Sequence, residues 1–165
     1  AMPYAQFQVC VDKQDSFGSK GYDAIRFLFS ANKGIAPDDL RRVASGGELS
    51  RLMLSIKSTV SSYSYIPTLI FDEIDTGVSG EVAAKIGNIM RQMGHLLQLI
   101  SITHLPQVAS QAEHHFFIYK DHHGPRTQSH IRALDATERI NEIAKMLSND
   151  KVTPEALRAA EVLMK

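Results

Sequence analysis

Two adjacent glycines stand directly before an apolar segment of helical periodicity in the stretch RVASGGELSR, residues 42–51. The first backbone N–H groups of a helix have no partner inside the helix, and the helix dipole adds partial positive charge there. Ser45 offers a hydroxyl, and Gly46 and Gly47 let a phosphate group approach the backbone closely. The stretch therefore indicates a phosphate-binding helix start. A sharp turn into a helix is the alternative, because short glycine motifs often occur by chance.

Two neighbouring carboxylates follow an apolar run in TLIFDEID, residues 68–75. In open α/β sheets, ligands bind at the carboxyl ends of the strands, where Asp72 and Glu73 are expected. Adjacent strand residues point to opposite sides, so the two side chains need not do the same work. One carboxylate can hold Mg²⁺, usually through its waters, and the other can act as general base toward an attacking water. The alternative is a solvated acidic strand end.

Histidines give a third, weaker signal. His104 in SITHLPQV follows another predicted buried strand, where it could donate a hydrogen bond to a phosphate oxygen or orient a water. A structural histidine is the alternative. Four further histidines cluster in sequence around a predicted strand and polar turn, together with Asp121; they are His114, His115, His122 and His123. Their spacing fits no known metal-ligand pattern, so an exposed turn is the preferred interpretation.

Alternating apolar patterns predict the strands that would hold these residues in place. Residues 5–12 and 22–30 are expected to pair as an N-terminal β-hairpin across a turn at 13–21. Two buried strands are expected within PTLIFDEID and LLQLISITH, each ending in polar residues. Two further strands are expected in HHFFIYK and QSHIRAL, on either side of a polar turn.

Helical periodicity predicts four helices. The first follows Gly47 and ends near Ser61. Its inward stripe is predicted to consist of Leu49, Leu52, Met53, Ile56 and Val60. The second begins after Ser79, the third at a capping box that starts with Asp135, and the last at Pro154.

Strands and helices alternate through the middle of the chain, which predicts an α/β fold with a mostly parallel central sheet and flanking helices. No internal boundary is visible, so residues 1–165 are expected to form one domain. Lys plus Arg and Asp plus Glu both number 18, so this domain carries no overall basic charge for DNA. The lone Cys10 excludes an internal disulfide and fits a reducing compartment. The apolar runs are too short to span a bilayer, and no secretion signal opens the sequence.

As a set, these motifs resemble those of ABC-type ATPases, in the form of the SMC-like branch. SGGELSR is similar to the signature motif of that family. The resemblance implies ATP as cofactor, with nucleotide contacts from Ser45, Gly46, Gly47 and Glu48. It runs from about Phe7 to the end of the chain.

The two strand-end motifs carry the rest of the resemblance. TLIFDEID resembles Walker B with its catalytic glutamate, which implies Mg²⁺ at Asp72 and the general base at Glu73. Asp75 resembles the D-loop aspartate, a cofactor contact, and ITH resembles the switch-histidine motif, which implies a catalytic role for His104.

The family's Walker A loop, ending in Gly-Lys-Ser or Gly-Lys-Thr, does not occur among the 165 residues. In the SMC-like family that loop lies in the N-terminal part of the polypeptide, before a long coiled coil. The resemblance thus implies the C-terminal half of a head, inactive alone, which hydrolyses ATP with the N-terminal head lobe and with a second head in an ATP-dependent dimer. It also implies DNA double-strand-break repair and recombination, with DNA bound through the full-length protein, and a cytoplasmic, nucleoid-associated location away from membranes. The alternative is the nucleotide-binding half of an ABC transporter.

Overall fold

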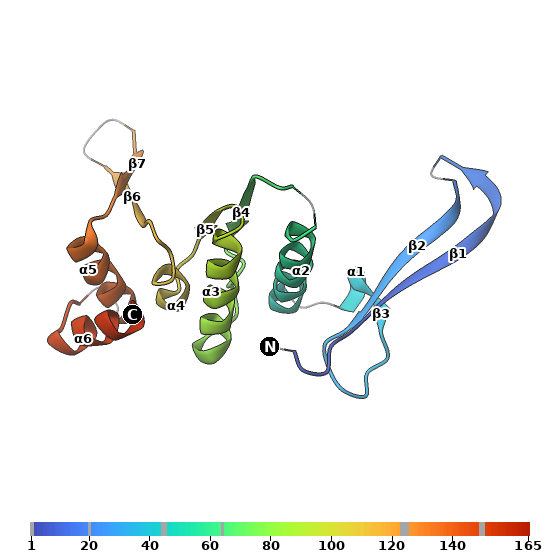
Figure 1. The fold of residues 1–165 in the computed structure, drawn as a ribbon, viewed down its shortest axis with the longest axis horizontal. Helices are drawn as coiled ribbons and strands as arrows, with labels where there is room; N and C mark the ends of the chain where they lie inside the picture. Colours follow the sequence, from blue (N-terminus) through green and yellow to red (C-terminus); the bar gives the residue numbers. More distant parts are fainter. Residues whose placement is uncertain (1, 20, 44–45, 64, 123–125, 149–150) are drawn as a thin grey trace. The chain divides into compact units, whose positions relative to one another are not determined.

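The computed structural model describes residues 2–19, 21–43, 46–63, 65–122, 126–148 and 151–165. Contacts divide the chain into two compact units, Ala1–Lys57 and Ser58–Lys165, which are taken one at a time below (Figure 1). The single domain expected from the sequence stays a prediction.

The first unit is built on the predicted N-terminal hairpin. Strand β1 (Gln6–Gly18) pairs antiparallel with β2 (Gly21–Ser30), and β2 pairs on its other edge with the short β3 (Asp38–Asp39), which α1 (Leu40–Val43) follows. The residues expected to form a turn after position 12 instead continue β1, with an irregular register between Lys13 and Gly18.

One face of this hairpin is apolar and open in the described chain. Cross-strand partners on that face are Phe7 with Phe29, Val9 with Phe27, and Val11 with Ile25. Phe29 at the base is fully buried, whereas the other five side chains are exposed. The rings of Phe7 and Phe27 stack with centroids 5.9 Å apart, so part of the apolar surface is covered from within.

Helix α2 (Gly46–Ser61) begins and ends where the sequence predicts. Its predicted inward stripe is only partly correct. Leu52 is buried, but Leu49, Met53 and Val60 are exposed, and Leu54, which was not assigned to the stripe, is almost fully buried. Periodicity identifies an apolar face of a helix, but it does not say which residues this chain alone can cover.

The second unit begins with a βαβ arrangement. Strand β4 (Thr68–Asp72) pairs in parallel with β5 (Gln98–Ile102), and α3 (Gly80–Gly94) connects them (Figure 1). A parallel pair requires such a crossover. Leu69 and Phe71 of β4 are buried, while Ile70 on the other face is exposed. The sequence predicted a strand buried on both faces, but β4 is covered on one face only in the described chain.

The α/β class is observed, but the mostly parallel central sheet is not seen in the described residues. Three small sheets are present there: β1-β2-β3, β4-β5 and β6-β7. Of these, β4-β5 alone is parallel, because helix α3 supplies a crossover and the other strands follow one another through short connections.

The remaining elements close the second unit. After α4 (Pro106–Ala109), strands β6 (Phe116–Asp121) and β7 (Gln128–Ala133) form an antiparallel hairpin. Helix α5 (Ala136–Leu147) starts at the predicted capping box of Asp135, and α6 (Pro154–Leu163) starts at Pro154. Helices α5 and α6 share a small hydrophobic core, in which Ile143, Ala144 and Ala160 are fully buried. None of the helices in the described ranges is both long and apolar enough for a membrane span.

Gly87 marks a close approach between α3 and α4. A Cβ at this position would lie 2.7 Å from the backbone oxygen of Gln107, whereas a Cβ at Gly94, at the end of the same helix, would meet nothing within 4 Å. We expect Gly87→Ala to lower the free energy of unfolding by about 1–3 kcal/mol through overpacking. The matched change Gly94→Ala should be neutral or should raise it by up to about 1 kcal/mol, since alanine favours the helix. Urea denaturation followed by circular dichroism compares them, and equal effects would contradict the close contact.

Candidate active site

The carboxyl ends of β4 and β5 lie at one edge of their sheet. Because the strands run parallel in the register Asp72 to Ile102, the residues that follow each strand are neighbours. The N–H of Glu73 donates a hydrogen bond to the carbonyl of Ile102, with a distance of 3.0 Å. Asp72, Glu73 and His104 are exposed at this edge. The structure therefore brings together the three strand-end residues that the sequence analysis selected.

Glu73 has an unusual backbone conformation. Its φ is +47°, and it is the one non-glycine residue with a positive φ among those described. This left-handed conformation costs an L-residue roughly 1–2 kcal/mol. Two hydrogen bonds to its carbonyl stabilise the turn, from the N–H of Thr76 at 3.1 Å and from the Thr76 hydroxyl at 2.8 Å. Strain of this kind gathers at functional sites, and here it falls on the residue predicted to be the general base.

The left-handed turn also changes how the two carboxylates are separated. Strand β4 ends at Asp72, so Glu73 lies outside it. Asp72 and Glu73 were expected to have different roles because neighbouring residues of a strand point to opposite sides. Glu73 lies in a turn, so this argument does not apply to it. Asp72 at the strand end is an exposed carboxylate that suits Mg²⁺, which takes one or two protein carboxylates and fills its other positions with water and phosphate oxygens.

Asp75 is placed differently from the other acidic residues. Its side chain is 1% exposed, and its Oδ2 accepts a hydrogen bond from the hydroxyl of Thr103. Its Oδ1 is buried and has no hydrogen-bond partner among the described residues. In this conformation Asp75 is closed to a nucleotide, so its predicted cofactor contact stays a prediction. Sequence reasoning missed Thr103, since a threonine beside a histidine carries no recognisable signal.

The signature residues belong to the first unit. Gly46 and Gly47 form the start of α2, with Glu48 in its first turn, and Ser45 lies outside the described residues. A Cβ on Gly46 would meet no atom of the described residues within 4 Å. The hydroxyl of Ser50 donates a hydrogen bond of 2.9 Å to the Gly46 carbonyl one turn earlier.

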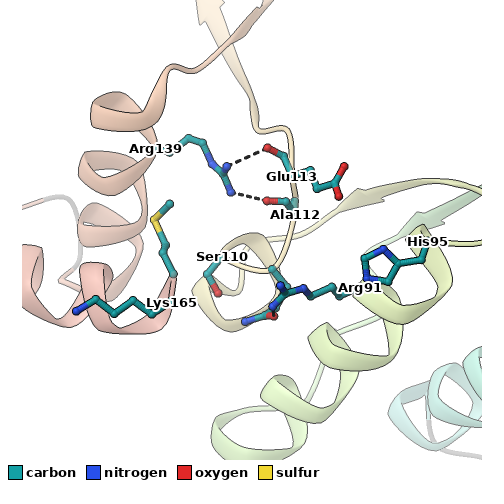
Figure 2. Close-up of a pocket in the computed structure, with 9 residues that line it drawn as sticks. Arg91, His95, Ser110, Ala112, Glu113, Arg139 and Lys165 are labelled. Atoms are coloured by element: carbon teal, nitrogen blue, oxygen red, sulfur yellow. Dashed lines mark hydrogen bonds between the residues drawn. The ribbon is translucent and has the colours of Figure 1, made fainter.

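A pocket of about 180 Å³ lies within the second unit (Figure 2). Arg91 and Arg139 line it from two helices. Arg139 donates to the backbone carbonyls of Ala112 and Glu113, the second at 2.9 Å, and so ties α5 to the segment after α4 (Figure 2). None of the predicted site residues lines this pocket.

The histidine-rich segment shows no metal centre where it is described. His122 makes a hydrogen bond of 3.1 Å with the Thr127 hydroxyl, and His123 lies outside the described residues. Across the described ranges, no group of three or more His, Cys, Asp or Glu side chains could hold a metal ion. His115 is half-buried, and its Nδ1 has no hydrogen-bond partner in the part of the chain that the structure describes. Burial together with the charge of Arg139 lowers its pKa, against a smaller opposing effect of Glu142.

Comparison with known sequences shows close relatives over nearly the whole chain. The chain is 38% identical over 165 residues to DNA repair protein RecN of Vibrio cholerae serotype O1, which covers 99% of this chain and 30% of that protein. It is 43% identical over 146 residues to DNA repair protein RecN of Bacillus subtilis strain 168, covering 88% of this chain and 25% of that protein. The chain thus spans less than a third of the length of these relatives. A comparison with models of protein families gives no match.

Solved structures of SMC proteins have a similar fold. The chain superposes with a TM-score of 0.62 on a structure from a study of ATP-driven dimerization and DNA stimulated activation of SMC ATPases, at 14% identity, covering 88% of this chain and 83% of that one. It superposes with a TM-score of 0.69 on the Smc head domain with a coiled coil and joint from Pyrococcus yayanosii, at 13% identity, covering 89% and 27%. The fold is therefore that of an SMC-type head.

The lowered pKa of His115 predicts a pH-dependent stability. The unfolded chain binds the proton more readily than the folded chain, so the stabilisation is complete above the unfolded pKa of about 6.5 and is lost as the pH falls below it. Urea midpoints between pH 7.5 and pH 5 should fall in the wild type and fall less in His115→Gln. His114→Gln, at the exposed neighbouring histidine, is the matched control and should keep the wild-type slope. Parallel curves for wild type and His115→Gln would contradict this assignment.

Proposed function

We propose that this chain, which is similar to DNA repair protein RecN over nearly its whole length, forms the C-terminal half of an SMC-like ATPase head that acts in DNA double-strand-break repair and recombination. The observation that carries the proposal is the sheet edge, where strained Glu73 is bonded to the end of β5 beside His104. An acidic pair and a histidine at the ends of two parallel strands are suited to phosphate chemistry. The transporter alternative has less support, since the relatives are repair proteins and the similar folds are SMC heads.

In the proposed reaction, Glu73 takes a proton from a water whose oxygen attacks the γ-phosphorus of ATP. The bond from that phosphorus to the bridging oxygen of ADP breaks, and ADP leaves with the electron pair. Asp72 would hold Mg²⁺, which when bound neutralises charge on the phosphate oxygens. His104 donates a hydrogen bond to the γ-phosphate or orients the water. The side chains of Asp72, Glu73 and His104 are exposed at the same sheet edge. Water and phosphate can therefore reach them without a rearrangement of the core.

The N-terminal head lobe of the same polypeptide is the first proposed partner. More than two thirds of each relative lies outside the length that this chain matches, and the chain has no Walker A loop of its own. Two apolar surfaces, each within its own unit, are open to receive such a lobe. One is the face of the β1-β2 hairpin, and the other is the outer face of β4-β5, with Ile70, Ile100 and Ile102 exposed. Contiguous apolar surface of this kind marks an interaction site.

A second head is the next proposed partner. Gly46, Gly47 and Glu48 at the start of α2, with Ser45 before them, would cap the γ-phosphate of ATP held by the Walker A loop of the other head. ATP-driven dimerization is named for the SMC ATPases that share the fold, which supports this arrangement. By this proposal the chain alone neither hydrolyses ATP nor binds it tightly. DNA would be contacted through the full-length protein, since this part has a formal charge of zero, and the location would be cytoplasmic and nucleoid-associated.

Replacing the proposed base tests the reaction directly. In the full-length protein, Glu73→Gln keeps the size of the side chain and removes its ability to take a proton. We expect kcat for ATP hydrolysis to fall by at least about a hundredfold, while ATP binding is retained and the heads stay engaged. Glu81→Gln is the matched control, because Glu81 is exposed on α3 and only pairs with Lys85. A Glu73→Gln protein with the wild-type rate would show that Glu73 is not the base.

Mixing two defective proteins tests whether the signature works in trans. Ser45→Arg places a long side chain before α2 and should abolish hydrolysis and head association, while a single head still binds ATP. A second variant lacks the Walker A lysine. In a mixture, one of the two composite sites receives both intact halves, so ATPase activity should reappear and pass through a maximum near equal amounts. If confirmed heterodimers show no activity at any ratio, the signature does not act across the dimer.

A further inference from the structure

We propose that Asp75 and Thr103 form a buried link that sets the position of Glu73 relative to His104, so that both act as positioning residues for ATP hydrolysis. Asp75 lies two residues after Glu73, and Thr103 lies immediately before His104. In this role neither side chain touches the substrate. The inference rests on the function proposed above, and it assigns to Asp75 a role other than the cofactor contact that its sequence motif implies.

The Thr103 hydroxyl is held on both sides. It donates its single hydrogen to Oδ2 of Asp75, and it accepts a hydrogen bond of 3.0 Å from the N–H of Leu105. The bond from Leu105 joins the residue after His104 to the side chain of the residue before it. The backbone on both sides of the histidine is therefore held by the Thr103 hydroxyl. Thr103 is half-buried and Asp75 is almost fully buried, and a hydrogen bond to a charged acceptor away from water is among the stronger ones in proteins.

The Glu73 side of the link is equally constrained. The N–H of Glu73 is bonded to the carbonyl of Ile102, one residue before Thr103, and the N–H of Val78 is bonded to the carbonyl of Asp75 at 3.2 Å. The turn after β4 and the segment after β5 are thus joined twice, once through the backbone and once through side chains. A left-handed residue persists only where its surroundings over-determine it, and these two connections supply that constraint.

Local stability alone does not account for the buried carboxylate. Asp75 places one oxygen, Oδ1, in the interior without a hydrogen-bond partner among the described residues. Leaving a buried polar atom unpaired is unfavourable, and apolar replacements of buried charges are often neutral or stabilising. We therefore explain the carboxylate at this position by its hydrogen bond to Thr103, which fixes the segment that carries His104.

The test uses the full-length protein and separates kcat from KM for ATP. Thr103→Val keeps the shape of the side chain and removes the hydroxyl. We expect kcat to fall between about tenfold and a hundredfold through misplacement of the reacting groups, with KM changed by less than about twofold. Thr103→Ser restores the hydroxyl and should regain most of kcat. The control is the same substitution at the opposite end of β4, Thr68→Val, which removes a hydroxyl and its hydrogen bond of 2.9 Å to Gln98 and should leave kcat unchanged.

Asp75→Asn, alone and combined with Thr103→Val, keeps the test decisive if one variant folds poorly, as judged by its melting temperature. The two changes act on one link, so the double variant should lose no more of kcat than Thr103→Val alone. Independent, multiplied losses would overturn the proposal, as would a wild-type kcat for Thr103→Val or an equal loss in Thr103→Ser. Wild type and Glu73→Gln are measured alongside. Absence of hydrolysis by the wild type, or full activity of Glu73→Gln, would refute the proposed function and not the link.

Discussion

Parallel pairing of β4 with β5 is the constraint on which the rest of the site depends. Two segments about 30 residues apart in sequence end at the same edge because their backbone hydrogen bonds fix the register Asp72 to Ile102. A shift by one residue would turn every side chain of a strand to the other face and would separate the acidic turn from the histidine segment. Helix α3 makes this register possible, since a parallel pair cannot be closed by a short turn.

The site is then refined by contacts that are individually small. A backbone bond from Glu73 to Ile102 and a side-chain bond from Thr103 to Asp75 hold two turns against each other. They do so next to a residue with φ of +47°, where a regular strand would be more stable. The strained residue lies in the turn after β4, and the bonds that support it come from Ile102 and Thr103 in the other segment.

The sequence was a good guide to elements whose signals are local. The start of α2 at the glycine pair, the capping box at Asp135 and the N-terminal hairpin all rest on neighbours within a few residues, and all three appear in the structure. Asp72, Glu73 and His104 were predicted to share a sheet edge, and they do. What could not be predicted depends on remote partners. The burial of Asp75 needs Thr103, 28 positions away, and the exposure of Met53 depends on what covers α2.

The exposed apolar faces of the β1-β2 hairpin and of the β4-β5 sheet affect how copies of the chain associate in solution. Copies of a protein in solution are kept apart chiefly by their net charge, and this chain has a formal charge of zero at pH 7. It also presents the apolar face of a long hairpin and a two-stranded sheet that no third strand in the described residues extends. Unpaired strand edges and uncovered apolar faces are templates for other chains. The same surfaces that are proposed to receive a second lobe therefore make this chain prone to associate with itself when they are uncovered.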